Sequence, residues 1–70
     1  MPTQNDIKLG KWLQKARKTA GFTQEQLADK ANLSVPYIGY LETGLRKPSL
    51  KTLKKLAKIM GVKVSDLIPY

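Results

Sequence analysis

The chain has 70 residues, a formal net charge of +8, and neither cysteine nor histidine. A domain of this size buries only about 60% of the surface of its unfolded chain. Without cysteine and histidine, the chain lacks disulfides, the commonest metal ligand and the side chain that carries protons near neutral pH. The composition therefore argues against an enzyme, a metal site or a cofactor. No stretch approaches the ~20 apolar residues of a membrane span, and the N-terminus does not resemble a signal peptide, so we expect a cytoplasmic protein.

The first expected helix covers residues 5–20. Apolar side chains recur there at spacings of three and four, which places them on one face of a helix; they are Leu9, Leu13, Ala16 and Ala20. Gly21 ends this helix, because glycine readily adopts the left-handed conformation just past a helix end. Trp12 lies at the margin of the apolar face, and we expect it to cover a neighbouring helix with part of its ring exposed.

A second helix is expected over residues 24–31. Thr23 and Gln26 have the spacing of a capping box, in which each side chain binds the backbone N–H of the other residue. Phe22 and Leu27 are spaced as the accompanying hydrophobic staple. The helix is short, because Asn32 favours a left-handed exit after two turns.

A third helix is expected over residues 35–43, capped by Ser34. Pro36 falls in its first turn, where the missing N–H would have no partner inside the helix. Gly44 ends the helix. Gly39, in its middle, costs roughly 0.5–1 kcal/mol relative to alanine, so we expect close approach at this position by either a packed neighbour or a ligand.

The fourth helix is expected to start at Pro48-Ser49 and to stop at Gly61. One face is apolar and the other carries lysines; the apolar positions are Leu50, Leu53, Leu56, Ala57 and Met60. After it, Ser65 caps at most one further turn of helix. Five short helices joined by tight turns predict a compact all-α domain.

Positive charge is concentrated in the second half of the chain. No acidic residue occurs from Thr43 to Ser65, where the cations are Arg46, Lys47, Lys51, Lys54, Lys55, Lys58 and Lys63. Such a cluster suits a polyanion such as nucleic acid. A solubilising lysine face is the alternative.

The two helices within residues 23–44 have the arrangement of a helix-turn-helix. The segments "GFTQEQLADKANLS", "YIGYLETG" and "RKPSLKTLKKLAKIMGV" resemble the Cro/repressor-type, or xenobiotic-response-element-like, helix-turn-helix domains of bacterial and phage regulators. The resemblance covers nearly the whole chain. It implies one five-helix lambda-repressor-like domain over residues 1–70, which binds a double-stranded DNA operator, usually as a homodimer, and acts as a repressor or controller protein.

The same resemblance assigns base contacts to the helix over residues 35–43. The positions that touch base edges are Val35, Pro36 and Tyr40, with Ser34, Tyr37, Gly39 and Thr43 beside them. Relatives often carry glutamine, arginine or serine where this chain has Val35 and Pro36. These side chains hydrogen-bond to base edges, and glutamine and arginine do so in a bidentate manner. We therefore expect thymine methyl groups to be read by these two residues, with Tyr40 as the polar or stacking contact. The rival hypothesis is that Val35 and Tyr37 are partly structural and that DNA shape supplies specificity.

Other contacts implied by the resemblance are to the DNA backbone. Gln24 at the start of its helix is expected to meet a phosphate, although ordinary first-turn polarity also explains it. The loop residues Thr43, Arg46 and Lys47 should lie along the backbone, with Lys51 next to them; we expect the other lysines of the fourth helix to be mostly solvated.

Arg17 and Glu42 occupy the positions of an ion pair in the resembling family. The pair would tie the first helix to the end of the third. Two solvated charges are the alternative.

A protein-interaction module, such as an antitoxin subunit, is the rival function. Ile59, Ile68 and Tyr70 lie outside the main apolar faces and could serve a protein partner or self-association. Dimerisation is expected through the end of the fourth helix and the tail. No effector pocket is expected at this size.

Overall fold

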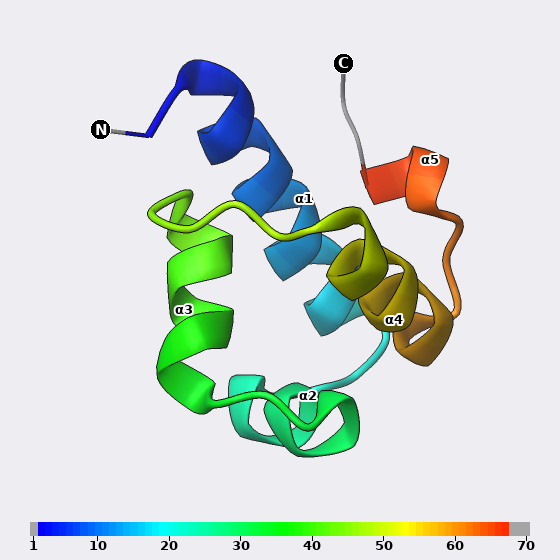
Figure 1. Cartoon of the computed structure of the whole chain (residues 1–70). Helices are drawn as coiled ribbons and strands as arrows, with labels where there is room; N and C mark the ends of the chain where they lie inside the picture. The colour runs from blue at the N-terminus through cyan, green and yellow to red at the C-terminus, as the bar shows by residue number, and fades with distance from the viewer. Residues whose placement is uncertain (1, 68–70) are drawn as a thin grey trace.

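The computed structural model describes residues 2–67, which form five α-helices and no strand. The helices are α1 (Gln4–Thr19), α2 (Gln24–Ala31), α3 (Val35–Thr43), α4 (Leu50–Met60) and α5 (Val64–Leu67). Four of them have eight residues or more, and α5 is a single turn. Figure 1 shows α3 at one side of the molecule, α4 and α5 at the other, and α1 running between them.

Side-chain caps begin the four longer helices. Thr23 and Gln26 form the expected capping box of α2, with N···O distances of 2.9 and 3.0 Å. Ser34 accepts a hydrogen bond from the backbone N–H of Tyr37 at the start of α3. Thr3 and Asp6 form a second capping box, which starts α1 one residue earlier than the apolar pattern predicts.

The helices end where the sequence places left-handed residues. Gly21, Gly44 and Gly61 have φ values of 83°, 84° and 73°, and Asn32 has a φ of 57°. Each of these residues turns the chain sharply after a helix. The connections therefore stay short, which keeps α2 and α3 adjacent.

A single core of apolar side chains joins the helices. It consists of Leu9, Leu13, Leu27, Ala28, Ala31, Ile38, Leu41, Leu53, Leu56, Ala57 and Met60. Helix α3 packs against α1 and α2, and α4 packs against α2 and α5. The side of α3 that these helices leave uncovered is consequently available to a partner.

Two glycines allow α1 to lie directly on the end of α3. A Cβ atom on Gly10 would lie 2.4 Å from the backbone oxygen of Glu42, closer than any side chain tolerates. A Cβ on Gly44 would lie 3.1 Å from the backbone of Asp6 and Ile7. The orientation of α3 is thus fixed by backbone contact with α1 at its C-terminal end.

Candidate nucleic-acid interface

The uncovered face of α3 carries large side chains in solvent. Val35 is 39% exposed and Tyr40 is 45% exposed, and Pro36 beside them is also exposed. The capping serine and the proline in the first turn hold this end of the helix regular. The three positions expected to meet base edges therefore lie on an open surface, which we call the α3 outer face.

Most polar groups near the α3 outer face already have partners within the helix. The hydroxyl of Thr43 lies 3.1 Å from the carbonyl oxygen of Gly39 and 3.3 Å from that of Tyr40, and the Ser34 hydroxyl is a helix cap. In the described part of the chain, the Tyr40 hydroxyl has no protein partner. Apart from this hydroxyl, the face consists mainly of methyl, methylene and ring surface.

Gly39 has open space around it. Among residues 2–67, no atom lies within 4 Å of the position that a Cβ would take, apart from the helix's own neighbouring backbone. Of the two explanations considered for this glycine, the packed neighbour is therefore wrong. Close approach by a molecule outside the chain stays as the prediction.

Tyr37 differs from its neighbours on α3. Its side chain is only partly exposed and packs against the apolar core. Part of this residue is thus structural, as the rival hypothesis held, whereas Val35 stands in solvent. Only the outer edge of Tyr37 is accessible to a ligand.

Arg17 and Glu42 form a buried ion pair between α1 and α3. Arg17 Nε donates to Glu42 Oε2 at 2.7 Å, and a second guanidinium nitrogen donates to Oε1 at 3.2 Å. The residues are 7% and 8% exposed. A third guanidinium nitrogen donates to the backbone oxygen of Phe22 at 2.8 Å, so the arginine also holds the turn before α2.

Gln24 belongs to this buried cluster, which sequence reasoning did not anticipate. Its Nε2 donates to Glu42 Oε1 at 3.0 Å, linking the first turn of α2 to the last turn of α3. One amide N–H is consumed by this bond, while the second N–H and the amide oxygen retain their bonding capacity. The unpaired backbone N–H groups of the first turn also remain at this end of α2.

Exposed cations follow α3, two in the loop and one in the first turn of α4. Arg46, Lys47 and Lys51 are all exposed, and the backbone N–H of Arg46 donates to the carbonyl oxygen of Tyr40 at 3.2 Å. This bond ties the loop to α3. The backbone at Arg46 therefore stays close to the last turn of α3.

Asp6 is an acidic neighbour of this loop. Hydrogen bonds from the backbone and side chain of Thr3 lower the pKa of the Asp6 carboxyl, and the charge of Lys47 acts in the same direction. The carboxylate is thus held ionised by the cap of α1.

The lysines of α4 are not equivalent. Lys54, Lys55 and Lys58 are all exposed, but Lys55 Nζ also donates to the backbone oxygen of Ala31 at 2.9 Å. A cation at this position satisfies a carbonyl at the C-terminus of α2 and interacts favourably with the helix dipole. Lys55 therefore stabilises the packing of α4 on α2.

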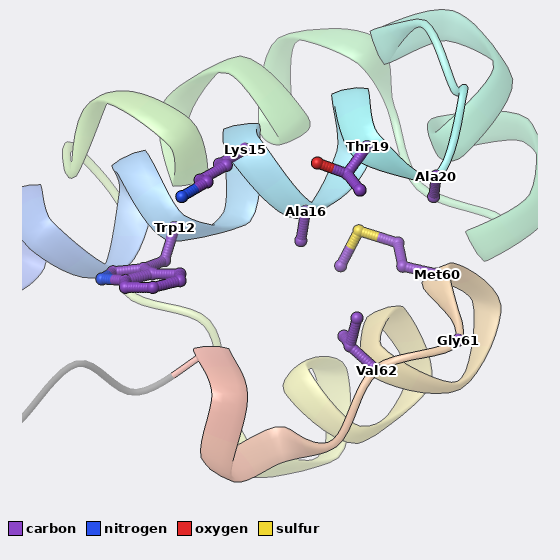
Figure 2. A pocket seen from close by; sticks show the side chains of 8 residues that line it. All are labelled: Trp12, Lys15, Ala16, Thr19, Ala20, Met60, Gly61 and Val62. Atoms are coloured by element: carbon purple, nitrogen blue, oxygen red, sulfur yellow. The ribbon is translucent and has the colours of Figure 1, made fainter.

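A cleft of about 350 Å³ lies between α1 and the end of α4 (Figure 2). Its lining consists of Trp12, Lys15, Ala16, Thr19, Ala20, Met60, Gly61 and Val62. Trp12 is 42% exposed, and Lys15 Nζ lies 5.2 Å from the centre of its ring. Ala16 and Ala20 are too small to fill the space between the two helices, which leaves this cleft open. A cleft by itself does not identify an effector, so the expectation of no effector pocket stays a prediction.

Metal sites and membrane-spanning helices are both absent from the described residues. No group of three or more acidic, histidine or cysteine side chains is placed to hold a metal ion in that range. Within the same residues, no helix is long and apolar enough to cross a membrane.

The sequence was compared with known protein families. A family described as helix-turn-helix matches residues 13–67. The transcriptional regulator DdrOP3 of Deinococcus deserti is 40% identical over 62 residues, which is 89% of this chain and 48% of that protein. The immunity repressor of Bacillus phage phi105 is 40% identical over 60 residues, 86% of this chain and 42% of that protein. The chain thus spans less than half the length of these two relatives.

Solved structures show the same arrangement of helices. The restriction-modification controller protein C.AhdI from Aeromonas hydrophila superposes with a TM-score of 0.88 at 32% identity, covering 93% of this chain and 98% of that one. The biofilm regulator SinR, solved in complex with DNA, gives a TM-score of 0.79 at 30% identity, covering 84% of this chain and 95% of that one.

Proposed function

Because this chain belongs to the helix-turn-helix family, we propose that it is a transcriptional regulator that binds double-stranded DNA with α3 in the major groove. The observation that carries this proposal is the α3 outer face, where Val35 and Tyr40 are 39% and 45% exposed. A helix inserted into a groove needs such an uncovered face. The similarity to SinR, solved in complex with DNA, supports the same function.

Backbone contacts provide affinity in this proposal. Arg46 and Lys47 lie along one strand, Lys51 lies next to them, and the amino end of α2 faces a phosphate with the backbone and side chain of Gln24. Glu42 fixes the orientation of the Gln24 amide through the 3.0 Å hydrogen bond. With about four or five phosphates neutralised per subunit, the logarithm of the binding constant falls with the logarithm of salt concentration at a slope near −0.9 per phosphate.

Base reading relies on the α3 outer face. Val35 and Pro36 present apolar surface to thymine methyl groups, and Tyr40 supplies a hydroxyl or a stacking surface. Gly39 lets the helix approach the groove closely, since it has no side chain and the described residues leave the space around it open. Thr43 contributes its methyl group and backbone, because its hydroxyl is bound within α3.

The protein acts in the cytoplasm as a homodimer in this proposal. Two subunits related by a two-fold axis would contact half-sites about 34 Å apart, one turn of DNA. We place the interface at the end of α4 and in the segment after it, residues 62–70. Ile59 lies at the end of α4 and is partly buried against the core, while Ile68 and Tyr70 lie outside the described residues.

A titration of fluorescently labelled random duplex tests the proposal. We expect saturable binding, followed by anisotropy, that weakens steeply when salt rises. Arg46→Gln should reduce the salt slope by about one, and Lys58→Gln on α4 is the matched control that should leave it unchanged. Absence of binding to random or selected DNA at micromolar protein would refute DNA binding and favour a protein-interaction module.

Selection of bound sites from a randomised DNA pool then gives the operator and its half-site spacing. On this operator, Tyr40→Ala should relax discrimination between base variants. Equal weakening on every sequence would instead assign Tyr40 to the phosphates.

A further inference from the structure

The α3 outer face is poor in hydrogen-bonding groups, and this limits what it can read. Recognition of a purine edge by a bidentate pair requires arginine, lysine, asparagine or glutamine. The exposed side chains here are Val35, Pro36 and Tyr40, and the Thr43 hydroxyl is held by carbonyl groups of its own helix. Apart from the Tyr40 hydroxyl, the features of a base pair that Val35 and Pro36 can sense are therefore its apolar ones.

In the major groove, the apolar feature of a base is a methyl group on C5 of a pyrimidine. Thymine carries this methyl group beside the acceptor O4, and cytosine carries a hydrogen at C5 beside the donor N4. Methylation of cytosine at C5 places a methyl group at the same ring atom as in thymine. A purely apolar contact to that methyl group does not depend on the neighbouring O4 or N4.

Tyr40 does not restore the distinction between the two bases. A phenolic hydroxyl both donates and accepts a hydrogen bond, and no residue in the described part of the chain fixes its direction. It can donate to O4 of thymine or accept from N4 of cytosine. From these contacts we propose that α3 reads the C5 methyl group of pyrimidines as such, so that methylation of cytosine in the operator strengthens binding.

This inference rests on the proposed function and adds a form of regulation to it. The expected size follows from the transfer of one methyl group out of water, which contributes about four-fold in affinity. The effect should be confined to base pairs that meet Val35 or Pro36. Every base pair contains one pyrimidine, so each position of a bound site is testable.

The experiment adds or removes one methyl group at a time in the selected operator. Replacement of one thymine by uracil deletes only the methyl group, and replacement of one cytosine by 5-methylcytosine adds only that group. We expect about three- to five-fold weaker binding for uracil at the contacted positions, and a gain of similar size for 5-methylcytosine at one or more positions. The same changes in the flanking DNA are the control and should have no effect.

The variant Val35→Ala connects the effect to the protein. Its side chain is in solvent, so the variant should fold, which a circular dichroism melt checks. In this variant the uracil and 5-methylcytosine effects at one base pair should shrink toward one-fold, and Pro36→Ala should do the same at the adjoining pair. Undiminished effects in both variants would overturn the assignment to these residues.

Two outcomes separate this inference from the proposed function. Tight binding with the same affinity for unmodified and modified operators would refute methyl reading and leave DNA binding intact. Weaker binding with 5-methylcytosine at every position would do the same. Failure to bind any duplex would refute both.

Discussion

Arg17→Met should unfold a large part of the population under mild denaturing conditions, because it leaves a carboxylate buried without its cation. Glu42 is 8% exposed, and its carboxylate receives two of its three hydrogen bonds from Arg17. After the change only the amide of Gln24 would compensate the charge. The Phe22 carbonyl would lose its guanidinium donor as well.

The magnitude follows from the burial of the pair. Removing one partner of a buried ion pair costs about 3–5 kcal/mol, whereas an exposed pair contributes about 0–1 kcal/mol. A chain of 70 residues has a total free energy of unfolding of about 3.5–10 kcal/mol at 0.05–0.15 kcal/mol per residue. The substitution should therefore remove a third or more of the stability.

Urea unfolding measures this effect, with Trp12 as the single tryptophan reporter and circular dichroism as the second probe. Lys18→Met is the matched control, since Lys18 is the adjacent cation of α1 and is exposed; it should change stability by less than about 0.5 kcal/mol. The double variant Arg17→Met with Glu42→Leu should recover much of the loss, because it removes the buried charge. A loss below about 1 kcal/mol for the single variant, or no recovery in the double, would refute this reasoning.

The remaining predictions concern three local features. Gly10→Ala should destabilise the fold strongly, because its Cβ would lie 2.4 Å from a backbone oxygen of α3. Gly39→Ala has open space around its Cβ and should raise the free energy of unfolding by about 0.5–1 kcal/mol. Equal urea midpoints for the two variants would contradict both predictions. The folded-state pKa of Asp6 is lowered, so the contribution of its carboxylate to stability is present above the unfolded pKa and is lost as pH falls through the folded pKa. Thermal melts from pH 7 to pH 2 should therefore show Asp6→Asn less stable than the parent at pH 7 and equal to it at the acid end. A stability difference that does not change across this range would contradict the linkage. Lys55→Met should lower the melting temperature more than Lys54→Met on the same helix, because only Lys55 binds a carbonyl of α2; equal melting temperatures would show that this bond contributes nothing.

Helices and turns were predictable because their signals are local. The capping box at Thr23, the serine cap at Ser34 and the left-handed Gly44 lie within a few residues of the ends that they define. The all-α fold and the family are confirmed by the structure and the family match. Helix α1 starts one residue earlier than the apolar spacing predicts, because its start is set by the capping box at Thr3 and not by that spacing.

Contacts between distant residues were harder to predict. Gln24 and Glu42 are 18 positions apart, and nothing in the spacing of either residue shows that their side chains meet. The bond from Lys55 to α2 and the close approach at Gly10 likewise depend on how the helices pack. The DNA contacts of Val35, Pro36 and Tyr40 stay predictions, because the exposure of a surface does not show which molecule binds to it.

The close backbone contacts and the ion pair between α1 and α3 lie at one end of α3, and this has a practical consequence. Gly10, Arg17 and Gly44 all fix its C-terminal end, whereas Val35 and Pro36 project from the opposite end. Val35 and Pro36 can therefore be substituted without repacking the contacts between α1 and the C-terminal end of α3. A combinatorial library at these two positions should yield folded proteins with new target preferences, at the cost of the first-turn stabilisation that Pro36 provides. The chain is thus a starting point for designed gene switches.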